Sequence, residues 1–434
     1  DGDHLEELGG DGAVSWEKYE LRHLCTEIID CVNKTAPISP IPTEYKMLRT
    51  SDIRNGRVNL DNLNCVSYET FEKWTRRGKL QAGDIIFTRE APLGEVGLVK
   101  NPDNYFLGQR LVLFRANPQV CDNRFLLYAL MYHDNKQAII GKGVGSTVLH
   151  LRVPECEKIT IKAPKLPMQH RIADILSAYD DLIENNRKQI KLLEEAAQRL
   201  YKEWFVDLHF PGHEHTKIVD GVPEGWEYIP LGKIVSYEIG GGWGEDVATG
   251  KNECPGFVIR GTDIDGINQG ELLLIPYRFH AKGNLAARKL QDGDIIFEVS
   301  GGSKNTGVAK TLLITKVLLD MWEKPVMCAS FCKLMRFDKH QIAQYIYDCL
   351  QYWRSVGETQ EYEKKSASSI INYRWKDFLE QKCVMLPEED LLQKYYTLSC
   401  SLYKKVTICS ITICKAIQAR DRLLPKLMSG EMEV

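Results

Sequence analysis

The chain lacks any long uninterrupted apolar run. The longest apolar stretches, such as residues 311–319, are broken by Lys or Thr and fall short of the roughly 18 residues that a membrane-spanning helix needs. The first residues, DGDHLEELGGDGAVS, also lack the basic start and apolar core of a secretory signal. We therefore expect no membrane contact, and we expect residues 1–15 to form a poorly ordered N-terminal extension.

The chain also lacks paired cysteine motifs and a strong charge of either sign. Its 13 cysteines include no CxxC pair, and an odd, scattered set in a long chain argues against a disulfide framework. The formal net charge is −3, so the overall basic charge of proteins that coat DNA is missing. We expect a cytoplasmic protein, in which any binding of nucleic acid depends on local basic patches.

The motifs of common nucleotide- and DNA-modifying enzymes are missing as well. GKGVGST at residues 141–147 has the composition of a phosphate-binding P-loop but not its order. The chain has no Pro-Pro pair, whereas amino-methyltransferases typically carry an Asn/Asp-Pro-Pro-aromatic stretch. Neither Asp84 nor Asp294 is followed by the acid-spacer-lysine pattern of metal-dependent nucleases. These absences predict no catalytic site, and they favour a turn-forming role for both aspartates.

One histidine-rich stretch, DLHFPGHEH at residues 207–215, is a candidate metal site. Histidine nitrogens and carboxylate oxygens are ordinary ligands of transition metals. However, the stretch contains Pro and Gly and lies between a long helical segment and Trp226. A solvated linker is therefore the favoured interpretation, and no metal site is predicted.

The chain does contain a repeat. LQAGDIIF at residues 80–87 and LQDGDIIF at residues 290–297 differ only at Ala82 and Asp292. Further matches keep the same order: residues 16–24 with 226–234, 48–53 with 259–264, 108–115 with 330–337, and 145–152 with 367–374. Repeated order of this kind indicates two copies of a domain of about 150 residues.

Within each copy, short β-branched runs bounded by Gly, Pro and Asn predict strands, for example at residues 84–87 and 159–161. Residues 124–140 and 341–356 are predicted to be helical. The predicted fold class is α/β (α+β), with two tandem repeated domains and two long helices.

The long helical segment after each copy carries a heptad pattern of apolar residues. The first seam consists of Ile172, Leu176, Tyr179, Ile183, Asn186, Ile190, Leu193, Ala197, Leu200 and Trp204. The corresponding C-terminal positions are Tyr395, Ser399, Leu402, Val406, Cys409, Ile413, Ala416, Arg420, Leu423 and Leu427.

A helix of about 35 residues, roughly 50 Å long, with a single apolar stripe needs a partner. We expect the two helices to pair in an antiparallel coiled coil; the alternative is that each helix packs on its own domain. Asn186 either fixes the register of the seam or is solvated at a gap in it.

Loops that combine Gly, Ser or Thr with Lys or Arg are candidates for DNA contact, because cations attract phosphate and small residues allow a close approach. In the first copy these candidates are Arg49, Arg54, Arg57, Arg89, Lys142, Ser146 and Thr147. In the second copy they are Lys251, Arg260, Lys304, Asn305, Lys364, Lys365 and Ser368. For each single residue a solvated surface charge is the simpler interpretation. The helical stretch 391–428 is also basic and is a further candidate for contact with DNA or an acidic partner.

Four features of the sequence are characteristic of one protein family. They are GWEYIPLGKI (225–234), the twin GDIIF strands, KLPMQHRIADILSAYDDLIENNRKQIKLLEEAAQRLYKEWFVDLHFP (165–211) and RLLPKLMSGE (422–431). In these features the sequence resembles the specificity subunits of type I restriction-modification enzymes, and the resemblance covers nearly the whole chain from Trp16 onward. The first fifteen residues have no counterpart in this pattern, and the second helix is poorer in Leu and has Arg420 in its seam.

This resemblance implies a division of labour. Two target-recognition domains, residues 16–167 and 226–388, would each read one half of a bipartite sequence in double-stranded DNA. The central helix (168–207), followed by a linker (208–225), and the C-terminal helix (389–430) would set the unread spacer. The resemblance also implies a subunit without catalysis or cofactor: two modification subunits would methylate adenine with S-adenosylmethionine, and restriction subunits would use ATP and magnesium.

Two other interpretations stay open. An orphan or decoy subunit would dock methyltransferases without useful DNA recognition. A nuclease with an unrecognised site would nick DNA by itself in the presence of magnesium.

Overall fold

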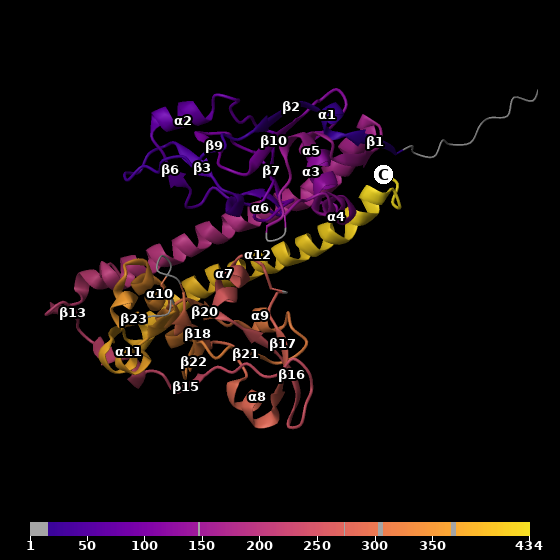
Figure 1. Ribbon diagram of the computed structural model, residues 1–434. Helices are drawn as coiled ribbons and strands as arrows, with labels where there is room; N and C mark the ends of the chain where they lie inside the picture. The colour runs from indigo at the N-terminus through magenta and orange to yellow at the C-terminus, as the bar shows by residue number, and fades with distance from the viewer. Residues whose placement is uncertain (1–15, 146–147, 273, 303–306, 366–369) are drawn as a thin grey trace, which may run out of the picture. The chain divides into compact units, whose positions relative to one another are not determined.

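The computed structural model describes residues 16–145, 148–272, 274–302, 307–365 and 370–434 (Figure 1). The chain divides into two compact units. The first unit contains the chain up to Asp181 and again from Gln418 to Val434, and the second unit runs from Leu182 to Ile417. Each unit therefore holds a domain of strands and short helices together with part of each of the two longest helices.

The strands of the first unit form a six-stranded sheet, a three-stranded sheet and a two-stranded ribbon. The six-stranded sheet has the order β2-β10-β7-β8-β5-β4, the three-stranded sheet has the order β6-β3-β9, and β1 pairs with β11. The bounds are β1 Glu17–Glu20, β2 Cys25–Asp30, β3 Lys46–Leu48, β4 Ile53–Arg54, β5 Gly56–Val58, β6 Asn64–Cys65, β7 Ile85–Thr88, β8 Val96–Leu98, β9 Tyr105–Leu107, β10 Leu111–Ala116 and β11 Thr160–Ala163.

The central strand β7 explains why the GDIIF motif is apolar without alternation. Ile85 and Phe87 lie in one hydrophobic cluster, together with Phe125 of α3. Ile86 points to the opposite face, where it joins a second cluster that includes Leu48 of β3. A strand that is buried on both faces has no polar side, so the motif is a structural core element.

The helices of the first unit are α1 Leu21–Leu24, α2 Tyr68–Trp74, α3 Asn123–Met131, α4 His133–Gly141, α5 Val153–Glu157 and the beginning of α6 Leu166–Tyr201; a 3-10 turn covers Thr50–Asp52. The predicted helix at residues 124–140 is thus two helices. Tyr132 adopts an extended conformation with ψ 129 and separates α3 from α4. The side chain of Asn135 then donates to the free carbonyl of Ala129 at 2.8 Å, which satisfies the interrupted helix end.

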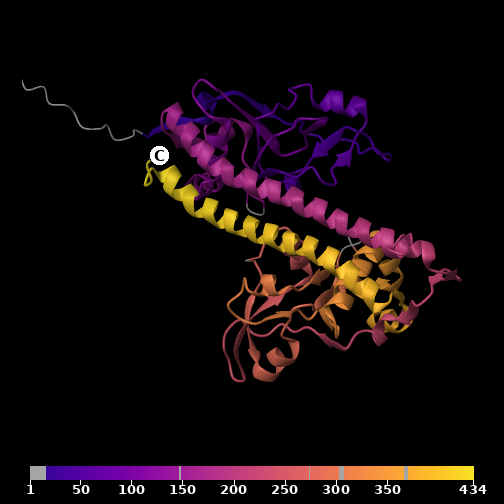
Figure 2. The ribbon, with the colours of Figure 1, turned by 180° about the vertical axis from the view of Figure 1, so that it is seen from behind.

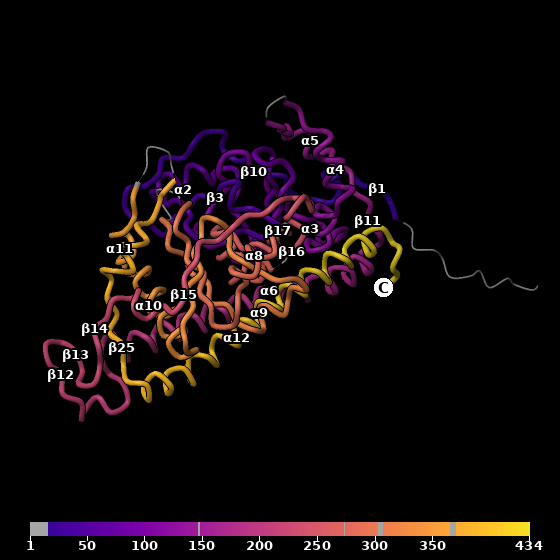
Figure 3. The backbone as a smooth tube through the Cα atoms, turned by 90° about the horizontal axis from the view of Figure 1, so that it is seen from below, coloured from indigo at the N-terminus to yellow at the C-terminus, as the bar shows by residue number. Residues whose placement is uncertain are grey.

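The second unit is built from several smaller sheets, of which the largest has the order β15-β22-β18-β20. The others have the orders β17-β16-β21, β19-β24-β23, β14-β25 and β12-β13. The bounds are β12 Ile218–Val219, β13 Val222–Pro223, β14 Glu227–Pro230, β15 Tyr237–Gly240, β16 Asn252–Ile259, β17 Tyr277–Ala281, β18 Ile295–Glu298, β19 Ser300–Gly301, β20 Thr311–Leu313, β21 Val326–Cys328, β22 Cys332–Arg336, β23 Glu363–Lys365, β24 Ile371–Tyr373 and β25 Cys383–Leu386. Figure 3 shows the ribbon β12-β13 beside β14 and β25.

The helices of the second unit are α7 Ile264–Asn268, α8 Lys282–Arg288, α9 Lys316–Leu319, α10 His340–Ser355, α11 Trp375–Gln381 and most of α12 Glu389–Ser429. Short turns of helix cover Lys202–Val206, His213–His215, Leu231–Lys233, Gly261–Asp263 and Glu358–Tyr362. Buried residues of α10, α11 and α12 and the end of α6 share one large aromatic cluster that includes Tyr201, Tyr345, Phe378 and Tyr395.

The same pairing scheme occurs in both units. The first strand of each domain pairs with its last strand, β1 with β11 and β14 with β25. The GDIIF strand pairs with β10 in the first unit and with β22 in the second unit. Both units also contain an equivalent parallel pair, β3 with β9 and β16 with β21. The first unit has a second parallel pair, β5 with β8.

The helices α6 and α12 have 36 and 41 residues, and each unit contains a place where they meet (Figure 2). In the first unit, Ile172 and Leu176 of α6 share a hydrophobic cluster with Leu424 and Leu427 of α12. In the second unit, the end of α6 and the beginning of α12 lie in the aromatic cluster described above. Across the described residues, we find no helix with the length and hydropathy of a membrane span.

Candidate nucleic-acid interface

Each GDIIF strand begins with a buried aspartate that holds an arginine of the neighbouring strand. In the first unit, Arg115 donates to Asp84 through Nε at 2.8 Å and through a terminal nitrogen at 2.9 Å. Asp84 also accepts from the backbone N–H of Gln81 at 2.7 Å. The hydrogen bonds to the carboxylate raise the pKa of Arg115. The carboxylate of Asp84 therefore stabilises the turn that precedes the strand.

The second unit repeats this arrangement with Asp294 and Arg336. The two arginine–carboxylate distances are 2.7 and 2.8 Å, and the N–H of Gln291 donates to Asp294 at 2.6 Å. This pair corrects the alignment predicted from the sequence, in which Arg115 stood opposite Phe337. Arg336 fills the place of Arg115, so residues 108–115 correspond to residues 329–336.

A loop edge lies at the far end of each GDIIF strand. In the first unit it consists of Arg89 and Glu90, of Arg110 in the turn before β10, and of residues 142–145 and 148–150. The N–H of Arg89 donates to the carbonyl of Arg110 at 2.8 Å, and Val144 and His150 exchange two backbone hydrogen bonds at 2.9 and 3.0 Å. The N–H of Leu151 donates to the carbonyl of Arg89 at 2.9 Å, so these contacts bring three loops that are distant in sequence to one place.

The loop edge of the second unit has the same connections. It consists of β19, of Phe331 in the turn before β22, and of β23 and β24. The N–H of Ser300 donates to the carbonyl of Phe331 at 3.2 Å, and its hydroxyl donates to Asn372 at 2.8 Å. The two edges are therefore equivalent in backbone and different in side chains.

The predicted contact residues fall into four groups, of which the first three are as follows. Lys142 and Lys364 are exposed on the two loop edges, and the only bond recorded for Lys142 Nζ in the described structure is to the carbonyl of Lys158 at 3.3 Å. Lys251 is exposed in a turn before β16, Arg54 is exposed at the end of β4, and Arg57 is half-buried on β5. Ser146, Thr147, Lys304, Asn305 and Ser368 lie outside the described residues, and only the backbone of Lys365 lies within them.

Three of the predicted arginines are engaged in the fold. Arg49 and Arg260 follow equivalent strands, and each caps a turn through Asp52 or Asp263, with N–O distances of 2.9 and 2.7 Å. Arg89 has a side chain that is only 16% exposed; it pairs with Asp30 at 3.3 Å and donates to the carbonyl of Leu151 at 3.0 Å. Each of these charges has a carboxylate partner, which weakens its attraction for phosphate.

The sequence reasoning missed two residues of the loop edges. Arg110 has φ 70 and a side chain that is 50% exposed, paired with Glu90 at 3.2 Å. Phe331 occupies the equivalent turn and is 56% exposed. An alignment of the two copies that matched Arg115 with Arg336 would have placed Arg110 opposite Phe331. It would have shown that equivalent positions of the two loop edges carry a cation and an aromatic ring.

A second missed feature lies in the loop after β15. The guanidinium of Arg278 lies 4.3 Å from the ring centre of Trp243, an arrangement in which the cation is attracted by the π-electrons of the ring. Trp243 itself is partly exposed. The cue in the sequence is the glycine-rich stretch GGGWG at residues 240–244, which allows the loop to lie close against the backbone of Cys328 and Ala329.

The seam residues of the two long helices are all buried or half-buried. Ile172, Leu176, Ile183, Ile190, Val406 and Ile413 are buried, and Tyr179, Leu193, Leu200, Leu402 and Leu423 are half-buried. Asn186 is also buried, and its side-chain amide donates to the carbonyl of Leu182 within its own helix at 2.8 Å. In the second unit, Cys409 lies 3.6 Å from Gln189 of α6.

The histidine-rich stretch that ends in His215 makes local contacts. The ring of His209 lies 3.0 Å from Glu203, and that of His213 lies 2.9 Å from the carbonyl of Phe210. Within the described part of the chain, no cluster of three or more His, Cys, Asp or Glu side chains has the geometry to hold a metal ion.

The first part of the chain matches a known protein family. Residues 14–195 match the family described as type I restriction modification DNA specificity domain. Residues 14–195 are therefore similar to a type I DNA specificity domain. The match includes the first loop edge and the larger part of α6.

Known relatives agree with this assignment over a longer stretch. The chain is 28% identical over 375 residues to a type I restriction enzyme specificity subunit, MjaIX, of Methanocaldococcus jannaschii, covering 81% of this chain and 78% of that protein. It is 27% identical over 132 residues to the HindI specificity subunit of Haemophilus influenzae, covering 30% and 29% of the two chains. The resemblance to type I specificity subunits is therefore confirmed.

A solved structure supports the fold. The type I restriction-modification S subunit from M. genitalium superposes with a TM-score of 0.57 at 17% sequence identity, covering 97% of this chain and 98% of that one. At this identity the comparison speaks for the mixed α/β fold with its long helices.

Proposed function

We propose that the two units of this type I specificity subunit each read one half of a bipartite DNA target. The observation that carries the proposal is the match of residues 14–195 to the DNA specificity domain. The second unit supports it, because it has the same strand pairing and the same buried pair, Asp294 with Arg336, at the start of its GDIIF strand. Two copies of one scaffold with different loop edges are suited to read two different sequences.

We place base recognition at the loop edges. Exposed Lys142 and Lys364 would attract phosphates, and Arg110 and Phe331 would reach the base edges. Arginine recognises guanine through two hydrogen bonds in the major groove, and an aromatic ring contacts the methyl group of thymine. The first loop edge would then prefer guanine and the second thymine, because one presents an arginine and the other an aromatic ring.

The helices α6 and α12 would form an antiparallel coiled coil that fixes the unread spacer. Support comes from the burial of both seams and from contacts at both ends of α6. In the first unit, Arg420 of α12 pairs with Asp180 of α6 at 2.6 Å. In the second unit, the beginning of α12 meets the end of α6. In an antiparallel pair, the end of one helix lies beside the beginning of the other, as these contacts require.

Catalysis would belong to partner subunits in the cytoplasm. Two modification subunits would dock on the long helices and methylate adenine with S-adenosylmethionine, and restriction subunits would use ATP and magnesium. The support is the family resemblance together with the structural role of Asp84 and Asp294, whose carboxylates are occupied by arginines. This chain would contribute recognition without a cofactor of its own.

The deciding experiment is sequencing of methylated adenines in a host that expresses this chain with its modification subunit. The matched control is the same host with the modification subunit alone. A bipartite motif that appears only with this chain supports the proposal. Methylation that is unchanged without the chain supports the orphan or decoy alternative. DNA nicking by the purified chain, dependent on magnesium, would support the enzyme alternative.

Half-site assignment follows from the same assay with variants of each loop edge. We expect Arg110→Ala to change or relax one half of the motif and Phe331→Ala to change the other half. The controls are Arg22→Ala and Lys316→Ala, which remove exposed cations away from the loop edges. If either edge variant alters both halves alike, the assignment of one half to each unit is wrong.

A further inference from the structure

A fully buried carboxylate in the second unit joins three helices. Asp348 of α10 has 0% exposure and accepts hydrogen bonds from the hydroxyls of Tyr395 and Tyr403, both on α12, at 2.6 and 2.5 Å. Gln344 of α10 donates to it at 3.1 Å. The backbone carbonyl of Asp348 lies 3.5 Å from the side-chain amide of Gln198 on α6.

The spacing of the tyrosines makes this contact selective for one register. Tyr395, Ser399 and Tyr403 follow one another at intervals of four residues, so they lie on the same side of α12. A shift of α12 by one turn, about 5.4 Å, would replace the two tyrosines either by Leu391 and Ser399 or by Ser399 and Thr407. Both shifted registers leave Asp348 with at most short hydroxyls as partners, and a buried carboxylate without donors is costly.

In the observed register, the hydroxyl of Ser399 does not donate a hydrogen bond to Asp348. Its side chain is fully buried between the two tyrosines, and its oxygen has no hydrogen-bond partner among the described residues. A serine here is too short to reach Asp348, so the two tyrosines alone on α12 hold the carboxylate. Buried polar contacts of this kind specify register more than they add stability.

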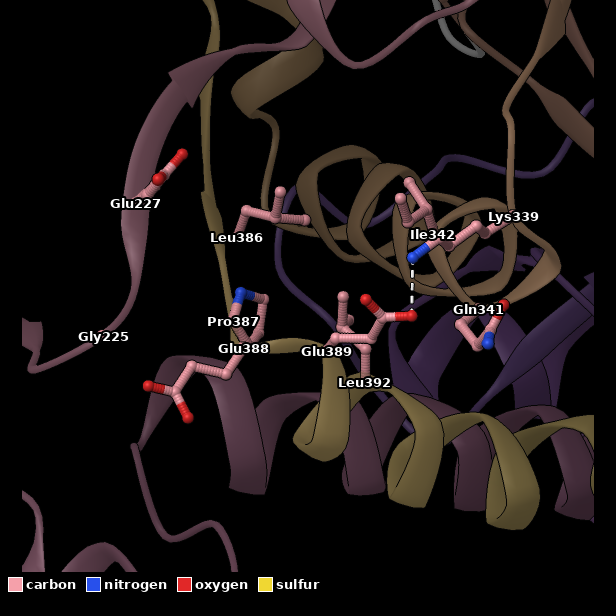
Figure 4. Close-up of a pocket in the computed structure, with 10 residues that line it drawn as sticks. All are labelled: Gly225, Glu227, Lys339, Gln341, Ile342, Leu386, Pro387, Glu388, Glu389 and Leu392. Carbon is pink, nitrogen blue, oxygen red and sulfur yellow. Dashed lines mark hydrogen bonds and ion pairs between the residues drawn. The ribbon is translucent and has the colours of Figure 1, made fainter.

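Buried apolar side chains of α10 and α12 also pack together, but the other polar contacts between α10 and the beginning of α12 are exposed and therefore weak. Lys339 and Glu389 form an ion pair at 2.5 Å at the rim of a hollow of about 290 Å³ (Figure 4). Their side chains are 48% and 67% exposed, and exposed pairs contribute about 0–1 kcal/mol. A neighbouring bond joins Gln341 and Gln393 at 2.6 Å. The buried contact of Asp348 thus has the greater effect on the register.

The first unit contains a comparable contact. Asp180 of α6 accepts from Tyr128 of α3 at 2.5 Å and pairs with Arg420 of α12. One turn on either side of Arg420, α12 offers only Ala416 and Leu424. In each unit, therefore, a buried or half-buried carboxylate and a tyrosine hydroxyl help to connect a helix of the domain, α3 or α10, to the long helices.

We propose that the contact of Asp348 with Tyr395 and Tyr403 sets the register of the second domain along α12 and thereby the length of the spacer between the two half-sites. The inference rests on the proposed function, in which the long helices set that spacer. A slip of one helical turn, about 5.4 Å, corresponds to one or two base pairs at about 3.4 Å each. Loss of the contact of Asp348 with Tyr395 and Tyr403 would allow spacers of neighbouring lengths and would leave the sequence of each half-site unchanged.

The test is the methylated-adenine assay with three variants, Tyr395→Phe, Tyr403→Phe and the double variant. Each single change removes one hydroxyl and leaves Asp348 two donors, so the domain keeps its fold. The matched control is Tyr347→Phe, whose hydroxyl accepts only from Gln351 within α10 in the described structure. The readout is the share of methylated sites at each spacer length, counted separately from the bases of each half-site.

We expect the double variant to retain both half-sites and to lower the preference for the native spacer over spacers one base pair longer or shorter by at least tenfold. The control should keep a single spacer. If the double variant methylates fewer sites but only at the native spacer, Tyr395 and Tyr403 have a merely structural role and the inference is wrong. If the unaltered chain itself yields no bipartite motif, the proposed function fails instead.

Discussion

Asp84 and Arg115 form a two-point ion pair across neighbouring strands, and Asp294 and Arg336 form the same pair 210 and 221 residues further along the chain. The aspartate side chains are 1% and 0% exposed. A charge this deeply buried is tolerated only where an opposite charge and hydrogen-bond donors compensate the loss of water. The pair therefore explains why the Gly-Asp of both GDIIF motifs is a structural requirement.

We expect Asp84→Ala to lower the free energy of unfolding of the first unit by about 3 kcal/mol, because Arg115 is left without its buried partner. Asp294→Ala should lower that of the second unit by a similar amount. Hydrogen exchange measured by mass spectrometry would localise each effect, to β7 and β10 or to β18 and β22.

Lys316→Ala is the control for these changes, since it removes an ion pair whose side chains are 74% and 61% exposed. It should change stability by less than about 0.5 kcal/mol. Equal effects of Asp84→Ala and Lys316→Ala would contradict the structural role assigned to the buried pair.

The sequence predicted the parts of the fold that leave a periodic or repeated signal. The twin GDIIF strands and the heptad seams are such signals, and the bounds of α12, Glu389–Ser429, lie within one residue of the predicted 389–430. The sequence could not show that Arg89 pairs with Asp30, because the two residues are far apart along the chain and meet only in the folded sheet. The same holds for Arg420, whose charge in an apolar seam is explained by Asp180.

The pair of Arg420 and Asp180 can be tested by a double-mutant cycle. Arg420→Met should cost about 2–3 kcal/mol of unfolding free energy, since among the described residues Asp180 then keeps only the hydroxyl of Tyr128 as a partner. Asp180→Asn should cost a similar amount, and the double variant should cost less than the sum by about 1–3 kcal/mol. Urea unfolding measures all four proteins, and strictly additive costs would show that the two charges do not interact.

The two exposed lysines of the loop edges should act through phosphate. We expect Lys142→Gln and Lys364→Gln each to reduce the slope of log K against log salt by about 1, because one fewer counterion is released on binding. Affinity should fall equally for target and non-target DNA. The measurement is a salt titration with the assembled methyltransferase, and Lys316→Gln is the exposed control. A loss confined to target DNA would instead indicate base contact.

Asp348 should make the stability of the second unit depend on pH. Burial raises its pKa to about 6, against the opposing hydrogen bonds from Tyr395, Tyr403 and Gln344. The folded state therefore binds the proton more tightly than the unfolded chain, whose aspartate has a pKa near 3.9. The resulting contribution to stability is fully present below about pH 4 and is lost as pH rises to 6, by roughly 3 kcal/mol.

The variant Asp348→Asn removes this titration and isolates it from that of every other group. Between pH 4 and pH 7, the stability of the unaltered chain relative to the variant should be greatest at pH 4 and should decrease by about 2 kcal/mol by pH 7. Urea unfolding of both proteins at several pH values in this range measures the difference. A difference that is constant with pH would mean that the folded state binds this proton no more tightly than the unfolded chain, so that the tyrosine hydroxyls fully offset the effect of burial on the pKa of Asp348.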